Sequence, residues 1–271
     1  PDSAEGRIVL RSADALRRLV WSPDELGLAR AYVAGDIDVE GDVFAVLETL
    51  RDAATLPGSR RSRSRYAAQV LPRAISAARR LGALGRPPAP PPEEARPRGR
   101  VHSRRRDAQV VSHHYDVGND FYRLVLGESM TYSCALWPEA TMSLAEAQAA
   151  KHELICRKLG LHERPGSRLL DIGCGWGSLA IHAASRHEAT VVGVTISREQ
   201  AELARRRVEE AGVGDRVEIR LQDYRDLRGE RFDAVSSVGM FEHVGAVRME
   251  EYLTRVHELL GPEGRLLNHA I

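Results

Sequence analysis

The sequence lacks the features that would place a protein in a membrane or give it a disulfide framework. It contains no run of about 18 apolar residues, so no transmembrane helix is expected. Its three cysteines, Cys134, Cys156 and Cys174, form neither a CxxC pair nor an even set, which favours a reducing cytoplasm. Lysine occurs only at Lys151 and Lys158, so arginine supplies nearly all of the positive charge.

The positive charge is concentrated in one stretch of the chain. The formal net charge is +1, but residues 58–106 hold fourteen arginines and only two acidic residues, Glu93 and Glu94. Such an asymmetry predicts a basic arm that meets an anionic surface, either phospholipid headgroups or nucleic acid. A solvated linker in a chain with high arginine usage throughout is the alternative.

Composition divides the 271 residues into three parts. Residues 1–57 are expected to form a small α+β accessory domain with a packing or substrate-presenting role. Residues 58–106 are expected to be a flexible linker rich in arginine and proline, because the prolines from Pro87 to Pro92 favour extended polyproline. Within this linker, Tyr66–Leu84 has the interleaved apolar and basic residues of an interfacial helix. Residues 107–271 form the third part.

The third part is organised around Leu169–Ser178, an apolar run that ends in glycines at positions 173, 175 and 177. It predicts a buried strand, a tight turn and a helix, because glycine permits unusual dihedrals and the close approach of a ligand. The spacing is not a dinucleotide fingerprint: Ser178 replaces the third glycine, and the next apolar run ends at Thr195 rather than at an acid. It is typical of the S-adenosylmethionine (SAM) loop of Rossmann-like methyltransferases. A glycine-rich turn without a ligand is the alternative.

Strands and helices alternate after this loop, which predicts a mostly parallel sheet flanked by helices. The further strands are expected at Val191–Val194, Val217–Leu221, Phe232–Val238 and Gly264–Ile271. Open α/β sheets bind ligands at the carboxyl ends of their strands. The polar residues at those ends are Asp171, Thr195, Asp223, Glu242 and His269. Of these, Asp223 can accept a hydrogen bond from an adenine amine, and the adjacent Tyr224 can pack on the ring.

Two of the expected helices have N-terminal capping signals. Ser143 and Glu146 form a capping box for a helix that reaches about Leu161, and Ser197 with Gln200 caps a later helix. Because a cap supplies partners for backbone N–H groups at a helix start, these residues mark where the two helices begin.

Two groups of polar residues lie upstream of the glycine loop. Tyr132, Ser133 and Cys134 are placed to close over a sulfonium, which aromatic faces attract; ordinary packing is the alternative. The adjacent His113 and His114 suggest a metal site, but no further His, Cys or acid sits at ligand spacing. We therefore expect capping or core hydrogen bonding from these histidines, and no metal ligands.

Taken together, these motifs resemble the cyclopropane-fatty-acyl-phospholipid synthase family of SAM-dependent methyltransferases. The similarity runs from about Ala31 to Ile271, outside the linker. It rests on His114–Tyr122, Thr131–Cys134, Asp171–Gly177, Gly193–Ser197, Gln222–Arg225 and Phe241–His243. Gly264–Ile271 is most similar to an actinobacterial branch that methylates oleoyl chains toward 10-methyl, tuberculostearic-type fatty acids. The resemblance implies an α/β fold of the Rossmann-like, class I SAM methyltransferase type.

The resemblance also implies two bound groups. The residues implied to bind SAM are Tyr132, Ser133, Asp171, Gly173, Gly175, Gly177, Thr195, Gln200, Asp223 and Tyr224. The Cys134 backbone, Glu242 and His269 are implied to hold a catalytic bicarbonate ion beside the methyl group. The chemistry agrees, because an alkene is a poor nucleophile whose methylation needs a stabilised carbocation and a proton acceptor. A desolvated carboxylate-like anion suits both tasks.

The implied function is transfer of a one-carbon unit from SAM to the double bond of an unsaturated fatty acyl chain of a phospholipid. A methylene-branched product is favoured, and a cyclopropane from the same substrates is the alternative. A non-catalytic SAM-binding scaffold and a nucleic-acid methyltransferase are rival interpretations. Glu242 and His269 argue against the scaffold, and the lack of an Asp/Asn-Pro-Pro-Tyr motif after the fourth strand argues against the nucleic-acid enzyme.

The implied partners are the phospholipid acyl chain and, through the basic linker, an anionic membrane, with no nucleic acid. We accordingly expect a cytoplasmic protein that is peripheral at the inner face of the membrane. A homo-oligomer, and a flavin or NADPH reductase acting on the product, are compatible with the resemblance. The family's fold continues through two more strands and a helical cover that supplies another tyrosine. We therefore expect the C-terminal part to be missing and this chain alone to be inactive.

Overall fold

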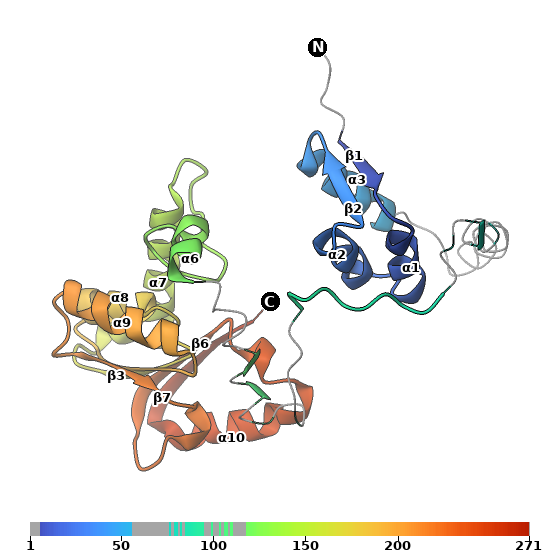
Figure 1. Cartoon of the computed structure of the whole chain (residues 1–271). Helices are drawn as coiled ribbons and strands as arrows, with labels where there is room; N and C mark the ends of the chain where they lie inside the picture. Colours follow the sequence, from blue (N-terminus) through green and yellow to red (C-terminus); the bar gives the residue numbers. More distant parts are fainter. Residues whose placement is uncertain are drawn as a thin grey trace. The chain divides into compact units, whose positions relative to one another are not determined.

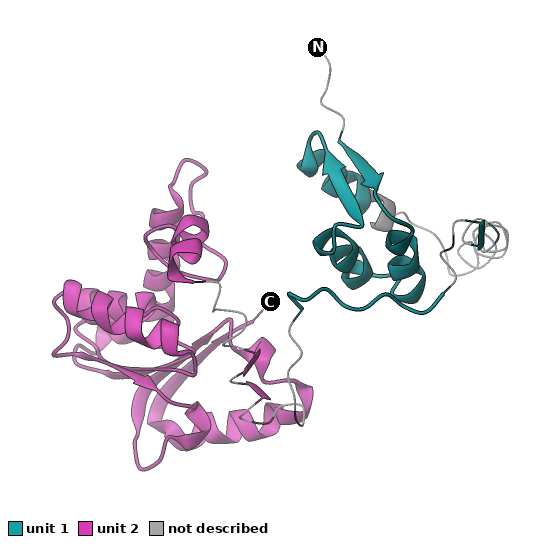
Figure 2. Ribbon diagram, in the orientation of Figure 1, with its two compact units in different colours: residues 1–95 teal, residues 96–271 magenta. Residues whose placement is uncertain are grey.

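The computed structural model describes residues 6–55, 85–94 and 118–270, together with isolated positions between 76 and 110. The chain forms two compact units, Pro1–Ala95 and Arg96–Ile271, which Figure 2 shows in separate colours. The elements of the first unit are β1 (Arg7–Leu10), α1 (Ala13–Trp21), α2 (Glu25–Val33), β2 (Ile37–Glu40) and α3 (Val43–Thr55). The helices of the second unit are α6 (Asn119–Leu126), α7 (Leu144–Leu159), α8 (Ser178–His187), α9 (Arg198–Glu210) and α10 (Met249–Leu259). Its strands are β3 (Arg168–Ile172), β4 (Thr190–Thr195), β5 (Val217–Leu221), β6 (Phe232–Val238) and β7 (Leu260–His269).

The first unit is the small α+β region that the sequence predicts. β1 pairs antiparallel with β2, and the Ser12 side chain caps α1 by accepting a hydrogen bond from the Asp14 backbone. Its small core consists of Ala15, Ala31 and Ile37. The Arg18 guanidinium lies 2.8 Å from the Asp36 carboxylate, and both side chains are largely buried. Because a lone buried charge is costly, each of these two groups depends on the other.

The proline-rich part of the predicted linker is bound to the first unit. Trp21 Nε1 donates to the Gly85 carbonyl at 2.9 Å, and Arg18 Nη1 donates to the Ala89 carbonyl at 2.8 Å. Arg30 binds the Glu94 carboxylate through two nitrogens, at 2.6 and 2.7 Å. Composition predicts a flexible segment here, whereas residues 85–94 are held by these contacts. The physical reason is that extended prolines leave backbone carbonyls exposed to side-chain donors. Most of the predicted interfacial helix at 66–84 lies outside the described residues.

The second unit is built on a five-stranded parallel sheet in the order β5-β4-β3-β6-β7. β3 is central, and its Asp171 lies opposite Gly193 of β4 and Ser236 of β6. Figure 1 shows α8 and α9 over one face of the sheet and α10 over the other. This arrangement confirms the predicted fold class. β7 starts earlier than predicted, because Leu260 already pairs with Phe232 and a register shift follows.

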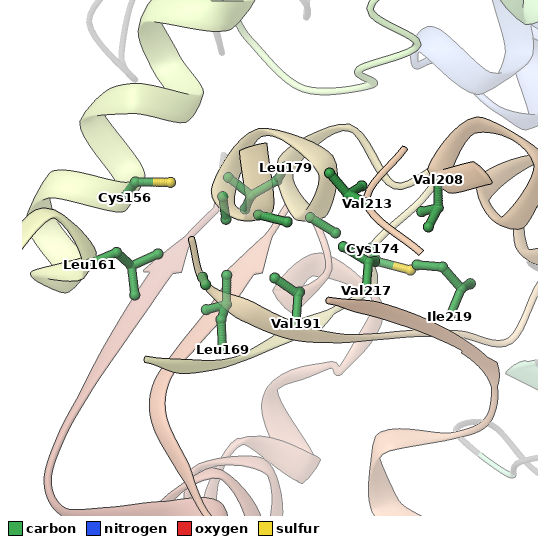
Figure 3. Packing of buried hydrophobic residues seen from close by; sticks show 14 of the residues in the cluster. Cys156, Leu161, Leu169, Cys174, Leu179, Val191, Val208, Val213, Val217 and Ile219 are labelled. Carbon is green, nitrogen blue, oxygen red and sulfur yellow. The ribbon is translucent and has the colours of Figure 1, made fainter. Parts of the chain in front are cut away.

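Both faces of the sheet are buried under helices. Because neighbouring residues of a strand point to opposite sides, each strand contributes to both cores. Leu169 and Val191 pack with residues of α7, α8 and α9 (Figure 3). Leu170 and Val192 pack on the other face, where α10 contributes Tyr252. A strand that is apolar on both sides can carry polar groups only at its ends, and the site is found at one such end.

Helix α7 lies against the site and has the capping box that the sequence predicts. The Glu146 backbone donates to Ser143 Oγ at 3.3 Å, and Glu146 Oε2 accepts from the Ser143 backbone at 2.8 Å. The helix ends at Leu159, slightly earlier than predicted, because Gly160 takes a left-handed conformation with φ of 76°. The Ser197 hydroxyl caps α9, also as predicted.

We predict that Ser143→Ala loosens the first turn of α7. Removing an N-cap hydroxyl typically costs about 1 kcal/mol, because backbone N–H groups at the helix start lose their partner. Amide hydrogen exchange measures this locally: the amides of residues 146–149 should exchange about fivefold faster, given roughly 1 kcal/mol of lost protection. Ser143→Asp, which keeps a capping oxygen, should exchange at the parent rate. Equal exchange in the alanine variant would show that the cap contributes nothing here.

Candidate active site

A cavity of about 410 Å³ lies at the carboxyl ends of the central strands. Ten of the residues predicted from the sequence line it. They are Tyr132, Ser133, Asp171, Gly173, Gly175, Thr195, Gln200, Asp223, Tyr224 and Glu242. Gly177, Cys134 and His269 do not line it. Residues more than 100 positions apart in the sequence therefore meet at one cavity, because parallel strands all end at the same edge of the sheet.

The glycine loop after β3 forms the floor of the cavity. Gly173 has φ of 75°, and a Cβ there would lie 2.9 Å from Met240 Cγ, so a larger residue could not be accommodated without a shift. Gly177 lies at the end of the same loop. It precedes α8 with φ of 81°, and a Cβ there would lie 3.3 Å from the Ala204 Cβ of α9. Its small size therefore serves the packing of α8 on α9.

Asp171 is a buried carboxyl group at the end of β3. The Ser236 hydroxyl donates to its Oδ1 at 2.7 Å. Burial raises the pKa of Asp171 to about 6, while the Ser236 hydrogen bond and the Lys151 charge act in the opposite direction. Its ionised form is held by these two partners.

Polar side chains at the next two strand ends are held by their neighbours. Thr195 Oγ1 donates to Gln200 Oε1 at 2.8 Å, so the Gln200 side chain is turned toward Thr195 rather than back to the helix cap. The Asp223 carboxylate is bound by Arg225, with Nη2 and Oδ2 at 2.6 Å. Arg225 also contacts Asp107, at 3.1 Å. These contacts fix the orientation of the polar groups toward the cavity.

Two residues of α7 that the sequence analysis missed hold the Tyr132–Cys134 segment in place. Lys151 Nζ donates to Ser133 Oγ at 2.7 Å, and Gln148 Nε2 donates to the Ser133 carbonyl at 2.8 Å. Lys151 is only 8% exposed and also lines the cavity. Burial lowers the pKa of Lys151 to about 8. The only available signal in the sequence was a rare lysine on a helix face that also carries apolar residues such as Ala147 and Ile155.

Cys134, which precedes the glycine loop in the sequence, and His269, at the end of β7, lie close together. Cys134 Sγ lies 3.6 Å from His269 Nε2. His269 Nδ1 is buried and has no hydrogen-bond partner among the described residues. The Gly239 backbone donates to the His269 carbonyl at 3.0 Å, and Gly239 lines the cavity. The pair therefore lies beside the cavity, which Glu242, in the turn after β6, also lines.

Two other predictions concern residues and elements outside this site. His113 and His114 lie outside the described residues. Among the helices of the described residues, none is long and apolar enough to cross a membrane.

A parallel sheet in this order, with a glycine loop and an acid after its central strand, defines the class I SAM-dependent methyltransferase fold. Residues 102–271 match the family model for mycolic acid cyclopropane synthetase, and the chain belongs to this family.

Relatives of the chain include proteins named for the modification of lipids. The whole chain is 44% identical, over 280 aligned residues, to a probable fatty acid methyltransferase of Mycobacterium tuberculosis, of which it covers 63%. Over 171 residues, or 63% of the chain, it is 49% identical to the cyclopropane-fatty-acyl-phospholipid synthase of Escherichia coli K12, of which it covers 43%. Mycolic acid cyclopropane synthase CmaA1, in a crystal structure with SAH and CTAB, aligns with a TM-score of 0.56 and 37% identity over 59% of this chain and 55% of that one. The chain thus spans less than two thirds of the length of each relative.

We predict that Lys151 reduces stability near neutral pH through the burial of its charge. Its pKa of about 8 lies below the ordinary value of about 10.4, so folding disfavours the charged form. The free-energy cost of burying the protonated amine is fully present below pH 8 and disappears as the pH rises to about 10.4. The free energy of unfolding of Lys151→Met, measured against the parent chain, should therefore fall by up to about 3 kcal/mol between pH 7 and pH 10.5.

Lys158→Met provides a matched control, because Lys158 is the only other lysine and is exposed on the same helix. Its difference from the parent chain should not change over this pH range. Urea unfolding at each pH gives both differences, and titration of the remaining groups cancels in them. A pH-independent difference for Lys151→Met would show that the buried amine is not the titrating group.

Proposed function

We propose that the protein to which this chain belongs transfers a one-carbon unit from SAM to the double bond of an unsaturated fatty acyl chain of a phospholipid. The favoured product is methylene-branched, a precursor of a 10-methyl fatty acid. The observation that carries the proposal is the contact of Cys134 with His269 beside a cavity that the glycine loop and Glu242 line. A candidate cofactor site thus lies next to groups that can hold an anion.

The residues around the cavity fit SAM. Gly173 and Gly175 bring backbone close to a ligand, and Asp223 with Tyr224 offers an acceptor and a ring for the adenine. Ser133, held by Lys151, and Tyr132 border the opposite side of the site, where an aromatic face favours a sulfonium. SAM would supply an electrophilic methyl group. The complex of CmaA1 with SAH supports a cofactor of this class.

The residues at the border of the cavity also fit a bicarbonate ion. A buried imidazole nitrogen without a partner, here His269 Nδ1, can donate to an anion oxygen when it carries its proton. The Cys134 backbone N–H would be a second donor, and Glu242 would orient the ion through a hydrogen bond. Bicarbonate would supply negative charge near a cationic centre and a proton acceptor. The chain's contribution is to hold that ion in place.

The nature of the product distinguishes two versions of this function. A fatty acid methyltransferase is 44% identical over the whole chain, which favours the methylene branch. A cyclopropane-fatty-acyl-phospholipid synthase is 49% identical over a shorter region, so a cyclopropane is the second candidate. Both outcomes require the same cofactor, anion and cation-tolerant pocket. We further propose that the protein acts in the cytoplasm at the inner face of the membrane, where its basic segment meets anionic lipid.

We predict that Glu242→Gln or His269→Ala, in the full-length protein, abolishes turnover and leaves SAM affinity within about threefold of the parent. The reason is that both residues are assigned to the anion and not to the cofactor, so only the reaction step loses a positioned group. Turnover is measured by methyl transfer from labelled SAM, and affinity by calorimetry. A loss of SAM affinity as large as the loss of turnover would contradict the assignment. Asp223→Ala is the converse control, because it should weaken SAM binding itself.

The product itself can be identified by proton NMR of lipid extracted after incubation of full-length protein with SAM and an oleoyl phospholipid. Vinylidene protons are the expected result and would establish the methylene branch. Upfield ring protons would establish the cyclopropane instead. An unchanged alkene, with SAM binding confirmed, would overturn the proposed function and leave a SAM-binding scaffold or a nucleic-acid methyltransferase. Binding of nucleic acid that weakens steeply with salt would select the latter.

A further inference from the structure

A second cluster of chemically active side chains lies between helices α7 and α8, and the proposed function does not use it. It consists of Glu153 and Cys156 on α7 and His182 and His187 on α8. The ligand atoms of Cys156, His182 and His187 all lie within 4.8 Å of one another. None of the four side chains lines the cofactor cavity. The cluster is therefore a separate feature of the second unit.

The carboxylate of Glu153 joins the two histidines. Glu153 Oε2 lies 2.9 Å from His187 Nε2 and 3.3 Å from His182 Nε2. A single carboxylate oxygen between two imidazoles is also found at metal sites. There the carboxylate is either a ligand of the metal ion or a hydrogen-bond partner of the histidines that bind it. The helical spacing explains the convergence, because Glu153 and Cys156 are three residues apart and so share one face of α7.

The burial of the cluster suits a bound ion with a route of entry. Cys156 is fully buried, and the side chains of His187 and His182 are 7% and 16% exposed. The Glu153 side chain is 40% exposed, so one side of the cluster faces solvent. A thiolate and two imidazoles, with a carboxylate oxygen as a fourth donor, form a set that favours Zn²⁺ over Mg²⁺ or Ca²⁺.

We propose that Cys156, His182 and His187 bind one Zn²⁺ ion, with Glu153 as the fourth ligand or as the partner that orients the histidines. Binding releases the thiol proton of Cys156 to solvent, and no electron is transferred. The ion fastens α7 to α8. Helix α7 carries Lys151 and Gln148, which hold the Tyr132–Cys134 segment, and helix α8 begins beside the glycine loop. The site is therefore structural, and its existence does not depend on the proposed reaction.

The first test is metal content. The chain is produced with zinc in the medium, freed of any histidine tag, dialysed against metal-free buffer and analysed by mass spectrometry for metals. The parent should retain about one Zn²⁺ per chain. Cys156→Ser and His187→Gln should each retain less than about a tenth of that amount, and Glu153→Gln should bind Zn²⁺ about tenfold to a hundredfold more weakly. Because the ion binds the folded state, added Zn²⁺ should raise Tm and a chelator should lower it.

Cobalt substitution identifies the ligands by a signal that does not depend on activity. Co²⁺ added to the parent should give a near-ultraviolet thiolate-to-metal band and visible bands of a four-coordinate ion. Cys156→Ser should lose the near-ultraviolet band. Cys134→Ser is the matched thiol control and should keep it, and His162→Gln, an exposed histidine on the same unit, should leave both sets of bands unchanged.

Two results would overturn the proposal. The absence of retained zinc and of a cobalt band in the folded parent would show that the cluster is a hydrogen-bonded network only. A band that survives in Cys156→Ser and disappears in Cys134→Ser would place the metal at the Cys134 and His269 pair instead. The parent measurement decides the first question even if the variants fail to fold, and circular dichroism reports whether they do.

Discussion

The pairing of β3 between β4 and β6 is the constraint on which the rest of the second unit depends. Backbone hydrogen bonds hold this strand on both sides, and helices cover both of its faces. Its side chains must therefore be apolar until the strand ends. Asp171 stands at that end, and the chain must then turn sharply at Gly173 so that α8 can return over the sheet. The cavity lies where this turn meets the chain that follows the neighbouring strands.

The two buried charged groups of the site, Asp171 and Lys151, are tolerated because each has a partner from another element. Asp171 is held by Ser236 and influenced by Lys151, and Lys151 in turn donates to Ser133. Burial moves the pKa of Asp171 up to about 6 and that of Lys151 down to about 8. Two ionisable groups whose pKa values are moved toward neutrality by a shared buried setting are typical of a functional site. The same setting makes the site costly to maintain without its ligand.

Helix α7 connects the two sites inferred for this unit. Its capping box fixes where the helix begins, and Gln148 and Lys151 follow on the side that holds Ser133. Glu153 and Cys156 follow in the next turns, on the side that meets the histidines of α8. A change in how α7 packs would therefore reach both the cofactor cavity and the proposed zinc site. In the first unit, by contrast, residues 85–94 are held by side chains of α1 and α2.

The amino-acid sequence alone predicts the strand and helix order, the glycine turn and ten of the residues that line the cavity, because these depend on local periodicity and on polar residues placed at strand ends. It also determined the capping residues Ser143 and Ser197. Which side chains meet follows from the tertiary fold: Lys151 reaches Ser133, Gly177 lies close to Ala204 of α9, and Cys156 lies beside two histidines of another helix. The physical reason is that such contacts depend on how helices are rotated and packed against the sheet, which no spacing along one segment specifies.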